Sequence, residues 1–238
     1  MYNYENLYRD MPKGKIAKTL TDRITDELIC GNLKPGDRLL TEVEFSKNLH
    51  VGRNAVRESM KVLEAFGVVE IRRAEGTFIA SAVNQNMIDS LIYNMIASLT
   101  PETALIEFKT VFITSVLSDI MNKVTQEDIN ELREICDLLK YNINVLKPKT
   151  DSVYRTYVNL LHRMAALSGN DCIEKFMEMI IRFTMPVTVK AINNCLTTKK
   201  GNEFVEIHTE LVELLRSRDN SQICRYADRS LEIWRKFV

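Results

Sequence analysis

Apolar residues recur at helical spacing along the first third of the chain, and two short strand-like runs follow them. Apolar positions four residues apart, from Ile16 to Leu28, predict a first helix. The stretch VGRNAVRESMKVLEAFG, residues 51–67, places its apolar residues on one side of a helical wheel and its polar residues on a separate arc. The runs VVEIRR and TFIAS flank the residues AEG, which predicts a small hairpin.

A capping box begins a short helix between these elements. The Thr41 hydroxyl can accept a hydrogen bond from the amide three residues later, and the Glu44 side chain can reach back. We expect this helix to end near Leu49, so that a tight His-Val-Gly turn leads into the stretch 51–67. The order helix, helix, helix, hairpin predicts a winged helix-turn-helix domain.

The rest of the chain has helical patterns almost throughout. Thr100 and Thr125 are expected helix N-caps, and Pro101 suits the first position of a helix. Gly169 is expected at a helix C-terminus, and Pro186 is expected to kink or split the helix around it. The fold class is therefore mostly α, with an all-α bundle after the winged domain.

Small and polar residues in the segment ASAVNQN mark the best candidate for a linker. The predicted segments are an N-terminal extension (1–12), a winged helix-turn-helix domain (13–80), a linker (81–86) and a helical effector-binding and dimerisation domain (87–238).

Composition excludes several classes of protein. Lys and Arg total 32, as do Asp and Glu, so any signal for nucleic-acid binding must be local. The five cysteines are odd in number and form no C-x-x-C pair, which argues against a disulfide framework or a zinc ribbon. The chain has neither a signal-peptide pattern at its start nor an apolar run long enough for a transmembrane helix. We therefore expect a soluble cytoplasmic protein that does not enter a membrane.

The polar arc of residues 51–67 has two interpretations. It is either a solvated face or a surface that carries Arg53, Asn54, Arg57 and Lys61 to DNA. The neighbouring capped helix and hairpin favour DNA, because the second helix of this motif enters the major groove, where arginine can bind guanine O6 and N7 together. The full set of candidate DNA-binding residues is Arg53, Asn54, Arg57, Lys61, Arg73 and Thr41.

The segment LTEVEFSKNLHVGRNAVRESMKVLEAFGVVEIRRAEGTFIA, preceded by LKPGDRL, resembles the DNA-binding domain of the GntR family of bacterial transcription regulators. The resemblance implies that Arg53 and Arg57 are the family's recognition-helix arginines and that Arg73 is its wing-tip residue. The sequence departs from the family pattern at Gly52, where Ser or Thr is frequent, and at Val43, where members often carry Arg.

The segments LLHRMAALSGN and EIHTELVELLRSRD resemble the FCD domain, the ligand-binding bundle of the FadR-type branch. That domain commonly binds a divalent metal through one Asp and three His. The resemblance assigns His162 and His208 to two of these positions, but Val158 and Ser230 occupy the other two. Candidate effector-binding residues are therefore His162, His208, Lys109 and Ser230, with a possible divalent metal at His162 and His208. Three outcomes stay open: a metal site, a metal-free pocket for an organic acid or acyl effector, and a vestigial pocket.

The leading hypothesis is a sequence-specific transcription regulator, a homodimer on palindromic double-stranded operator DNA, controlled by a small-molecule effector. The alternative is a helical-bundle metalloprotein with a fused helix-turn-helix. The sequence has no G-x-S-x-G, P-loop or H-E-x-x-H motif, and no Glu lies three residues before a His, so we do not expect an enzyme.

Overall fold

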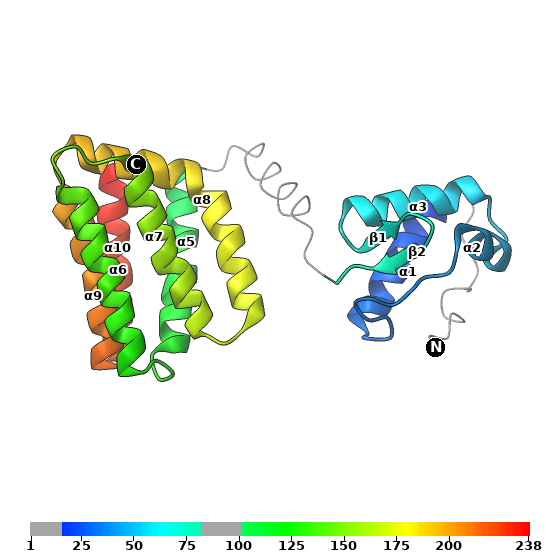
Figure 1. Ribbon diagram of the computed structural model, residues 1–238, viewed down its shortest axis with the longest axis horizontal. Coiled ribbons are helices and arrows are strands. Elements are labelled where there is room, and N and C mark those ends of the chain that lie inside the picture. The colour runs from blue at the N-terminus through cyan, green and yellow to red at the C-terminus, as the bar shows by residue number, and fades with distance from the viewer. Residues whose placement is uncertain (1–15, 82–100) are drawn as a thin grey trace. The chain divides into compact units, whose positions relative to one another are not determined.

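The computed structural model describes residues 16–81 and 101–238, which belong to two compact units (Figure 1). The predicted fold class, a winged helix-turn-helix unit and a helical unit, is confirmed. The expected extension 1–12 lies outside the described residues, as do all but the first residue of the expected linker 81–86.

In its described residues, 16–81, the N-terminal unit has three helices and a two-stranded sheet in the expected order. Its elements are α1 (Ile16–Ile29), α2 (Glu42–Leu49), α3 (Arg53–Ala65), β1 (Val69–Arg72) and β2 (Gly76–Ile79). The two strands pair antiparallel, with Val69 opposite Ile79 and Arg72 opposite Gly76. An isolated bridge between Arg38 and Phe78 adds the segment before α2 to the other edge of β2.

One apolar core holds this unit together. Leu20 and Ile24 of α1, Phe45 of α2 and Val56 and Leu63 of α3 are all fully buried. Each helix therefore contributes an apolar stripe, and the burial of these stripes supplies most of the stability that short helices lack in isolation.

The second unit is an all-α bundle. Its elements are α5 (Glu102–Ile120), α6 (Gln126–Asn144), α7 (Thr150–Leu167), α8 (Asp171–Thr197), α9 (Gly201–Ser217), the 3-10 turn η2 (Asn220–Gln222) and α10 (Ile223–Phe237). Helix α7 packs along α6 and α8, α6 also packs on α9, and α5 packs on α10 (Figure 1). Side chains from all these helices enter one core, so the bundle forms a single packed body.

The helix ends follow local sequence signals. Thr41 and Glu44 form the predicted capping box. Thr125 is the predicted N-cap of α6, and it also completes a capping box with Asp128 that was not predicted. Gly169 has φ of +64° immediately after α7, a conformation that glycine adopts without strain. Helix α5 begins at Glu102 with Pro101 in the N-cap position, one residue later than expected, and Thr100 lies outside the described residues.

Pro186 lies inside α8, which continues as one helix from Asp171 to Thr197. The helix is therefore not split, but its ribbon bends sharply along its length, in keeping with the expected kink (Figure 1). Pro186 is on the exposed side of the helix, where water can reach the carbonyl group that proline leaves without its helical donor.

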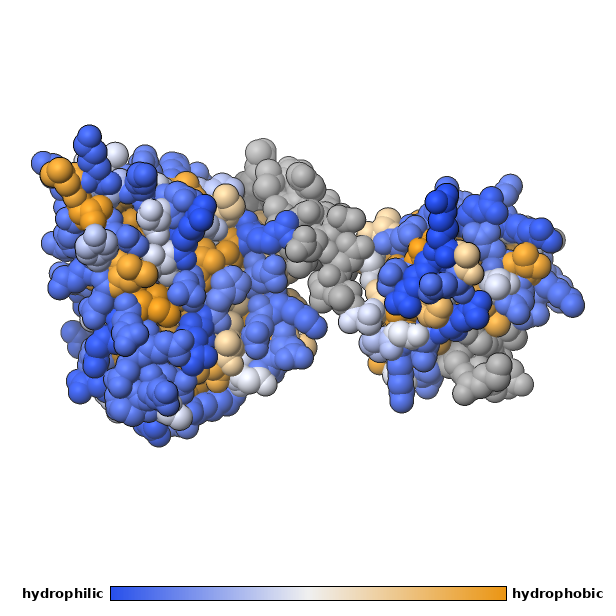
Figure 2. Space-filling view, viewed as in Figure 1, coloured by the Kyte–Doolittle hydropathy of each residue, from blue (hydrophilic) through white to orange (hydrophobic). Residues whose placement is uncertain are grey.

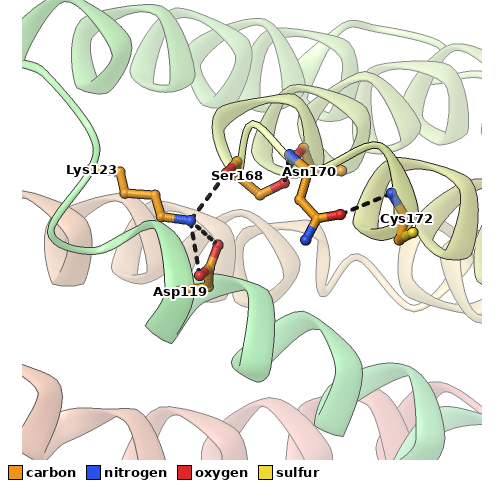
Figure 3. A network of polar contacts seen from close by, with 6 residues as sticks. Asp119, Lys123, Ser168, Asn170 and Cys172 are labelled. Atoms are coloured by element: carbon orange, nitrogen blue, oxygen red, sulfur yellow. Dashed lines mark hydrogen bonds and ion pairs between the residues drawn. The ribbon is translucent and has the colours of Figure 1, made fainter.

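A polar network ties the turn between α7 and α8 to the end of α5 (Figure 3). The Lys123 ammonium donates to the Asp119 carboxylate at 2.7 Å and to the Ser168 carbonyl at 3.0 Å. The Asn170 side chain caps α8 by accepting from the Cys172 amide at 2.9 Å. This network satisfies backbone groups at two helix ends that have no partner within their helices.

Polar side chains cover most of the visible surface of each unit, with apolar side chains between them (Figure 2). Among the described residues, no helix combines the length and the apolar character needed to cross a lipid bilayer.

Gly201, the first residue of α9, lies against Ile143 of α6, and a Cβ at this position would overlap the Ile143 side chain. We expect Gly201→Ala to lower the free energy of unfolding by about 1–3 kcal/mol through overpacking, although alanine normally favours a helix. Urea unfolding followed by fluorescence measures this, because Trp234, the chain's single tryptophan, is buried in the same unit. In an Ile143→Ala background, Gly201→Ala should change the free energy of unfolding little, because the overlapping side chain is gone. An equal loss of unfolding free energy in the wild-type and Ile143→Ala backgrounds would contradict the overlap.

Candidate functional site

Helix α3 is anchored to α1 along one side. Val56, Met60 and Leu63 are buried, and the Ser59 hydroxyl lies 3.1 Å from the Ala17 carbonyl oxygen and 2.9 Å from the Ala55 carbonyl oxygen. These contacts fix the rotation of α3 about its axis. The opposite side of the helix, which carries the predicted DNA-binding residues, is therefore turned outward.

Four of the six candidate DNA-binding residues share the outward face of α3. Arg53 and Asn54 are exposed in its first turn, Arg57 lies one turn further along and Lys61 one turn beyond that. Gly52 is the N-cap and has no side chain to bond the first amides of the helix. The helix N-terminus therefore keeps exposed N–H groups beside two arginines, which suits a phosphate or a base edge.

Arg57 makes an ion pair with Glu42 at the start of α2. Its Nη2 lies 3.0 Å from Glu42 Oε2, and its Nε lies 3.1 Å from the same oxygen. The sequence pattern did not indicate this partner, because the two residues are 15 positions apart and meet only when α2 packs on α3.

Thr41 has a structural role in this unit. Its hydroxyl accepts from the Glu44 amide at 3.3 Å, and its own amide donates to the Glu44 carboxylate at 2.8 Å. These bonds hold the first turn of α2. Thr41 is also exposed, so its predicted contact with DNA stays a prediction.

The hairpin carries two arginines with different surroundings. Arg72 pairs with Glu70 at 3.2 Å, and its guanidinium lies 4.6 Å from the centre of the Phe78 ring. Glu70 is the main cause of a raised Arg72 pKa. Arg73 is exposed at the turn, next to Ala74, which has φ of +66°. Arg73 is therefore placed at the tip of the wing, as the sequence predicted.

Arg38 is a basic residue of the wing that the sequence analysis missed. It is exposed on the segment bridged to β2, and its side chain lies so close to Gly76 that a Cβ there would be 3.2 Å from Arg38 Nε. The pattern around it indicated a loop, and only strand pairing brings it beside the hairpin.

In the helical unit, three of the four candidate effector residues lie in the interior. Lys109 of α5, His208 of α9 and Ser230 of α10 are buried at 1%, 3% and 4% exposure. A small cavity of about 10 Å³ adjoins His208 and Ser230, which is near the smallest volume that can hold one water molecule. Its lining consists of Thr110, Ile113, Tyr157, Leu161, His208, Leu211, Tyr226, Ser230 and Trp234.

Aromatic rings fill the space around this cavity. The ring of Tyr157 lies 5.0 Å from that of His208 and 5.6 Å from that of Trp234, measured between ring centres. The Tyr157 hydroxyl is buried and has no hydrogen-bond partner in the part of the chain that the structure describes. The interior is thus mainly apolar, with one unsatisfied hydroxyl group.

Lys109 lies beside these rings with its amine 3.3 Å from the centre of Trp234. The amine donates to Thr188 Oγ1 at 3.1 Å. Burial lowers the Lys109 pKa well below its usual value, because the ammonium form loses its hydration.

His208 is held as a neutral side chain. Its Nδ1 lies 2.6 Å from the Phe204 carbonyl oxygen, which can only accept, so Nδ1 carries the proton and Nε2 keeps a lone pair. Burial lowers the His208 pKa to about 4, although the bond to Phe204 raises it slightly.

Residues 16–79 match the family described as "Bacterial regulatory proteins, gntR family", a range that runs from the first residue of α1 to the last of β2. The match covers the described elements of the N-terminal unit, which is therefore similar to the domain that this family model describes.

Longer matches extend the likeness beyond the GntR domain. The chain is 25% identical over 205 residues to YcbG, an uncharacterized HTH-type transcriptional regulator of Bacillus subtilis, and the match covers 86% of this chain and 82% of YcbG. It is 28% identical over 104 residues to the HTH-type transcriptional regulator LutR of the same species, covering 44% of this chain and 48% of LutR. The solved structure of Streptococcus agalactiae GntR has 19% identity and a TM-score of 0.53, with coverage of 92% and 97%, which indicates a shared fold.

The structure does not place His162 beside His208 in the cavity lining. His162 is exposed on α7, whereas Tyr157 and Leu161 of the same helix line the cavity. In the residues that the structure describes, no group of three or more His, Cys, Asp or Glu side chains could hold a metal ion. His208 is the one strong metal ligand in the cavity lining, so these residues do not fit the metal site of the FCD domain.

The buried His208 should make stability depend on pH. An unfolded histidine titrates near 6.5 and the folded one near 4, so between these values the unfolded state binds more protons and acid favours unfolding. We expect a loss of about 3 kcal/mol as pH falls from 6.5 to 4. His208→Leu should lose this part of the pH dependence, and the matched change His162→Leu, at an exposed site, should keep it. Urea unfolding at several pH values, monitored by Trp234 fluorescence, tests this, and identical slopes for the two variants would contradict it.

Proposed function

We propose that this chain is a DNA-binding transcription regulator that reads a double-stranded operator through α3 and the wing of its GntR domain. The observation that supports this most is the outward face of α3, where Arg53, Asn54, Arg57 and Lys61 share one side of a helix preceded by a tight turn. In a helix-turn-helix motif the second helix, here α3, enters the major groove with its N-terminal residues toward the bases.

The proposed contacts divide by their place on the domain. Arg53, Asn54 and Arg57, on the first two turns of α3, would read base edges, and Lys61 would meet phosphate. Arg73 at the wing tip and Thr41 at the start of α2 would contact the sugar-phosphate backbone of the DNA on either side of the major groove that α3 enters. Since operator DNA lies in the bacterial cytoplasm, the protein would act there.

We also propose that the protein works as a homodimer on a palindromic operator and that its helical domain is of the FCD type. Dimers of this motif bind half-sites about one helical turn apart, so a symmetric protein matches a symmetric operator. The support for the FCD type is that His208, Lys109 and Ser230 of three different helices meet in one interior region.

The effector would be a small organic acid or acyl compound bound without metal. The Tyr157 hydroxyl, the lone pair of His208 Nε2 and the Ser230 hydroxyl are polar groups that such a ligand could meet in the cavity. A cavity of about 10 Å³ must enlarge to admit it, and Trp234 and Tyr226 are the large lining side chains whose movement would open it.

The small cavity favours a second candidate, a regulator with a vestigial pocket. Rings of Tyr157, Phe204 and Trp234 already pack where a ligand would lie, at centre distances of 5.3–5.7 Å. In this case the helical domain would serve dimerisation alone. A helical-bundle metalloenzyme has less support, because the cavity lining offers a single histidine.

We expect Arg53→Ala and Arg57→Ala each to weaken binding to the operator by about ten- to a hundredfold, because each removes a side chain able to bond guanine at two points. Fluorescence anisotropy with duplex DNA at several salt concentrations measures this, and the salt dependence should also fall. Arg155→Ala removes an exposed arginine from α7 and should leave binding unchanged. Unaltered binding in both GntR-domain variants would exclude the proposed reading helix.

Treatment with a metal chelator should change neither the stability of the protein nor its affinity for DNA. After dialysis against EDTA we expect the same unfolding temperature and the same DNA affinity, and we expect Zn²⁺ to change neither, since the cavity has one histidine rather than a full ligand set. Differential scanning fluorimetry and metal analysis of the purified protein check this. One equivalent of tightly bound metal, lost with a drop in unfolding temperature, would overturn the metal-free site.

A further inference from the structure

Arg57 and Glu42 connect the two helices of the helix-turn-helix through their side chains. Glu42 Oε2 accepts a hydrogen bond from Arg57 Nε at 3.1 Å and lies 3.0 Å from Arg57 Nη2 in an ion pair. The Arg57 side chain remains 57% exposed, whereas that of Glu42 is 32% exposed. The carboxylate therefore lies underneath the guanidinium, and the guanidinium still faces solvent.

The bonds to Glu42 use one edge of the guanidinium group. An arginine side chain has five N–H donors in a rigid plane, and the Nε donor bonds Glu42 while Nη2 lies beside the same carboxylate oxygen. The other donors are on Nη1 and Nη2, at the end of the side chain. That end is the one that binds guanine O6 and N7 together, so the ion pair and base reading are compatible.

Glu42 itself is firmly placed. It is the first residue of α2, whose N-terminus is held by the capping box of Thr41 and Glu44 and whose Phe45 and Leu49 are buried in the core. A carboxylate is also favourable at this end of a helix, where the first amides point outward. The position of Glu42 is therefore set by the fold and does not depend on DNA.

Glu42 also changes the charge of the reading surface. An unpaired Arg57 would be attracted to any phosphate, and this attraction is the same for all DNA sequences. With Glu42 beside it, the pair is nearly neutral overall, so attraction to phosphate is reduced while the directed bonds of the guanidinium remain. The side chain is also spared part of the entropy loss on binding, because its rotamer is already fixed.

We propose that Glu42 is a positioning residue that orients Arg57 for one base pair and suppresses its use as a non-specific phosphate contact. This inference rests on the proposed function, because it requires that α3 reads DNA. It goes further by assigning part of the sequence specificity to a negatively charged residue that lies outside the reading helix.

The experiment begins with duplexes selected by the wild-type protein from a random pool. The affinities of wild type, Glu42→Ala, Glu42→Gln and Glu64→Ala are then measured for the selected duplex and for a scrambled duplex of the same length. Glu64 is an exposed carboxylate at the other end of α3, so Glu64→Ala controls for the loss of one negative charge. Glu42→Gln keeps the shape of the side chain, and circular dichroism verifies that each variant retains its helices.

We expect Glu42→Ala to lower the ratio of selected to scrambled affinity by about tenfold, with scrambled affinity unchanged or higher. The affinity ratio of Glu42→Gln should lie between those of Glu42→Ala and wild type, and Glu64→Ala should keep the wild-type ratio. A repeat selection with Glu42→Ala should lose preference at one position of each half-site. An unchanged ratio, or an equal fall in Glu64→Ala, would overturn the inference while leaving DNA binding intact. If wild type selects no sequence, the proposed function fails, and the inference fails with it.

Discussion

The burial of Val56, Met60 and Leu63 against α1 determines which side chains of α3 the N-terminal unit presents to solvent. A helix free to rotate would offer a different residue every 100°, and the polar arc would have no defined target. The Ser59 hydroxyl strengthens this constraint, since it reaches the backbone of α1 from a fully buried position. The orientation of Arg53 and Arg57 is thus a consequence of apolar packing on the opposite side of the same helix.

The helical domain has a different balance of forces. A lysine placed among aromatic rings loses hydration that a single hydrogen bond to Thr188 does not replace. The face of Trp234 recovers part of this cost through its attraction for a cation, and a shift toward the neutral amine avoids the rest. Lys109 can therefore remain in the core without a carboxylate beside it.

The sequence predicted features that depend on neighbouring residues and failed on those that depend on distant ones. The capping box at Thr41 and the N-cap at Thr125 each depend on at most four consecutive residues, and both predictions were correct. The amphipathic pattern of α3 correctly predicted which of its residues are exposed, because the apolar and polar sides of the helix differ strongly. On α7 the family resemblance assigned His162 to the pocket, whereas the structure places Leu161 in the cavity lining and leaves His162 exposed. The partnership of Glu42 with Arg57 and the burial of Lys109 arise from the packing of separate helices, for which no local pattern exists.

Gly52 is a glycine that the backbone does not require. Its φ of −65° is open to every amino acid, and a Cβ at this position would meet no atom within 4 Å. The corner where α3 begins can therefore gain a side chain without disturbing the core, the turn or the wing. Descendants of this protein could acquire a new operator preference by a single substitution here, at almost no cost in folding, so recognition can diverge while the scaffold stays constant.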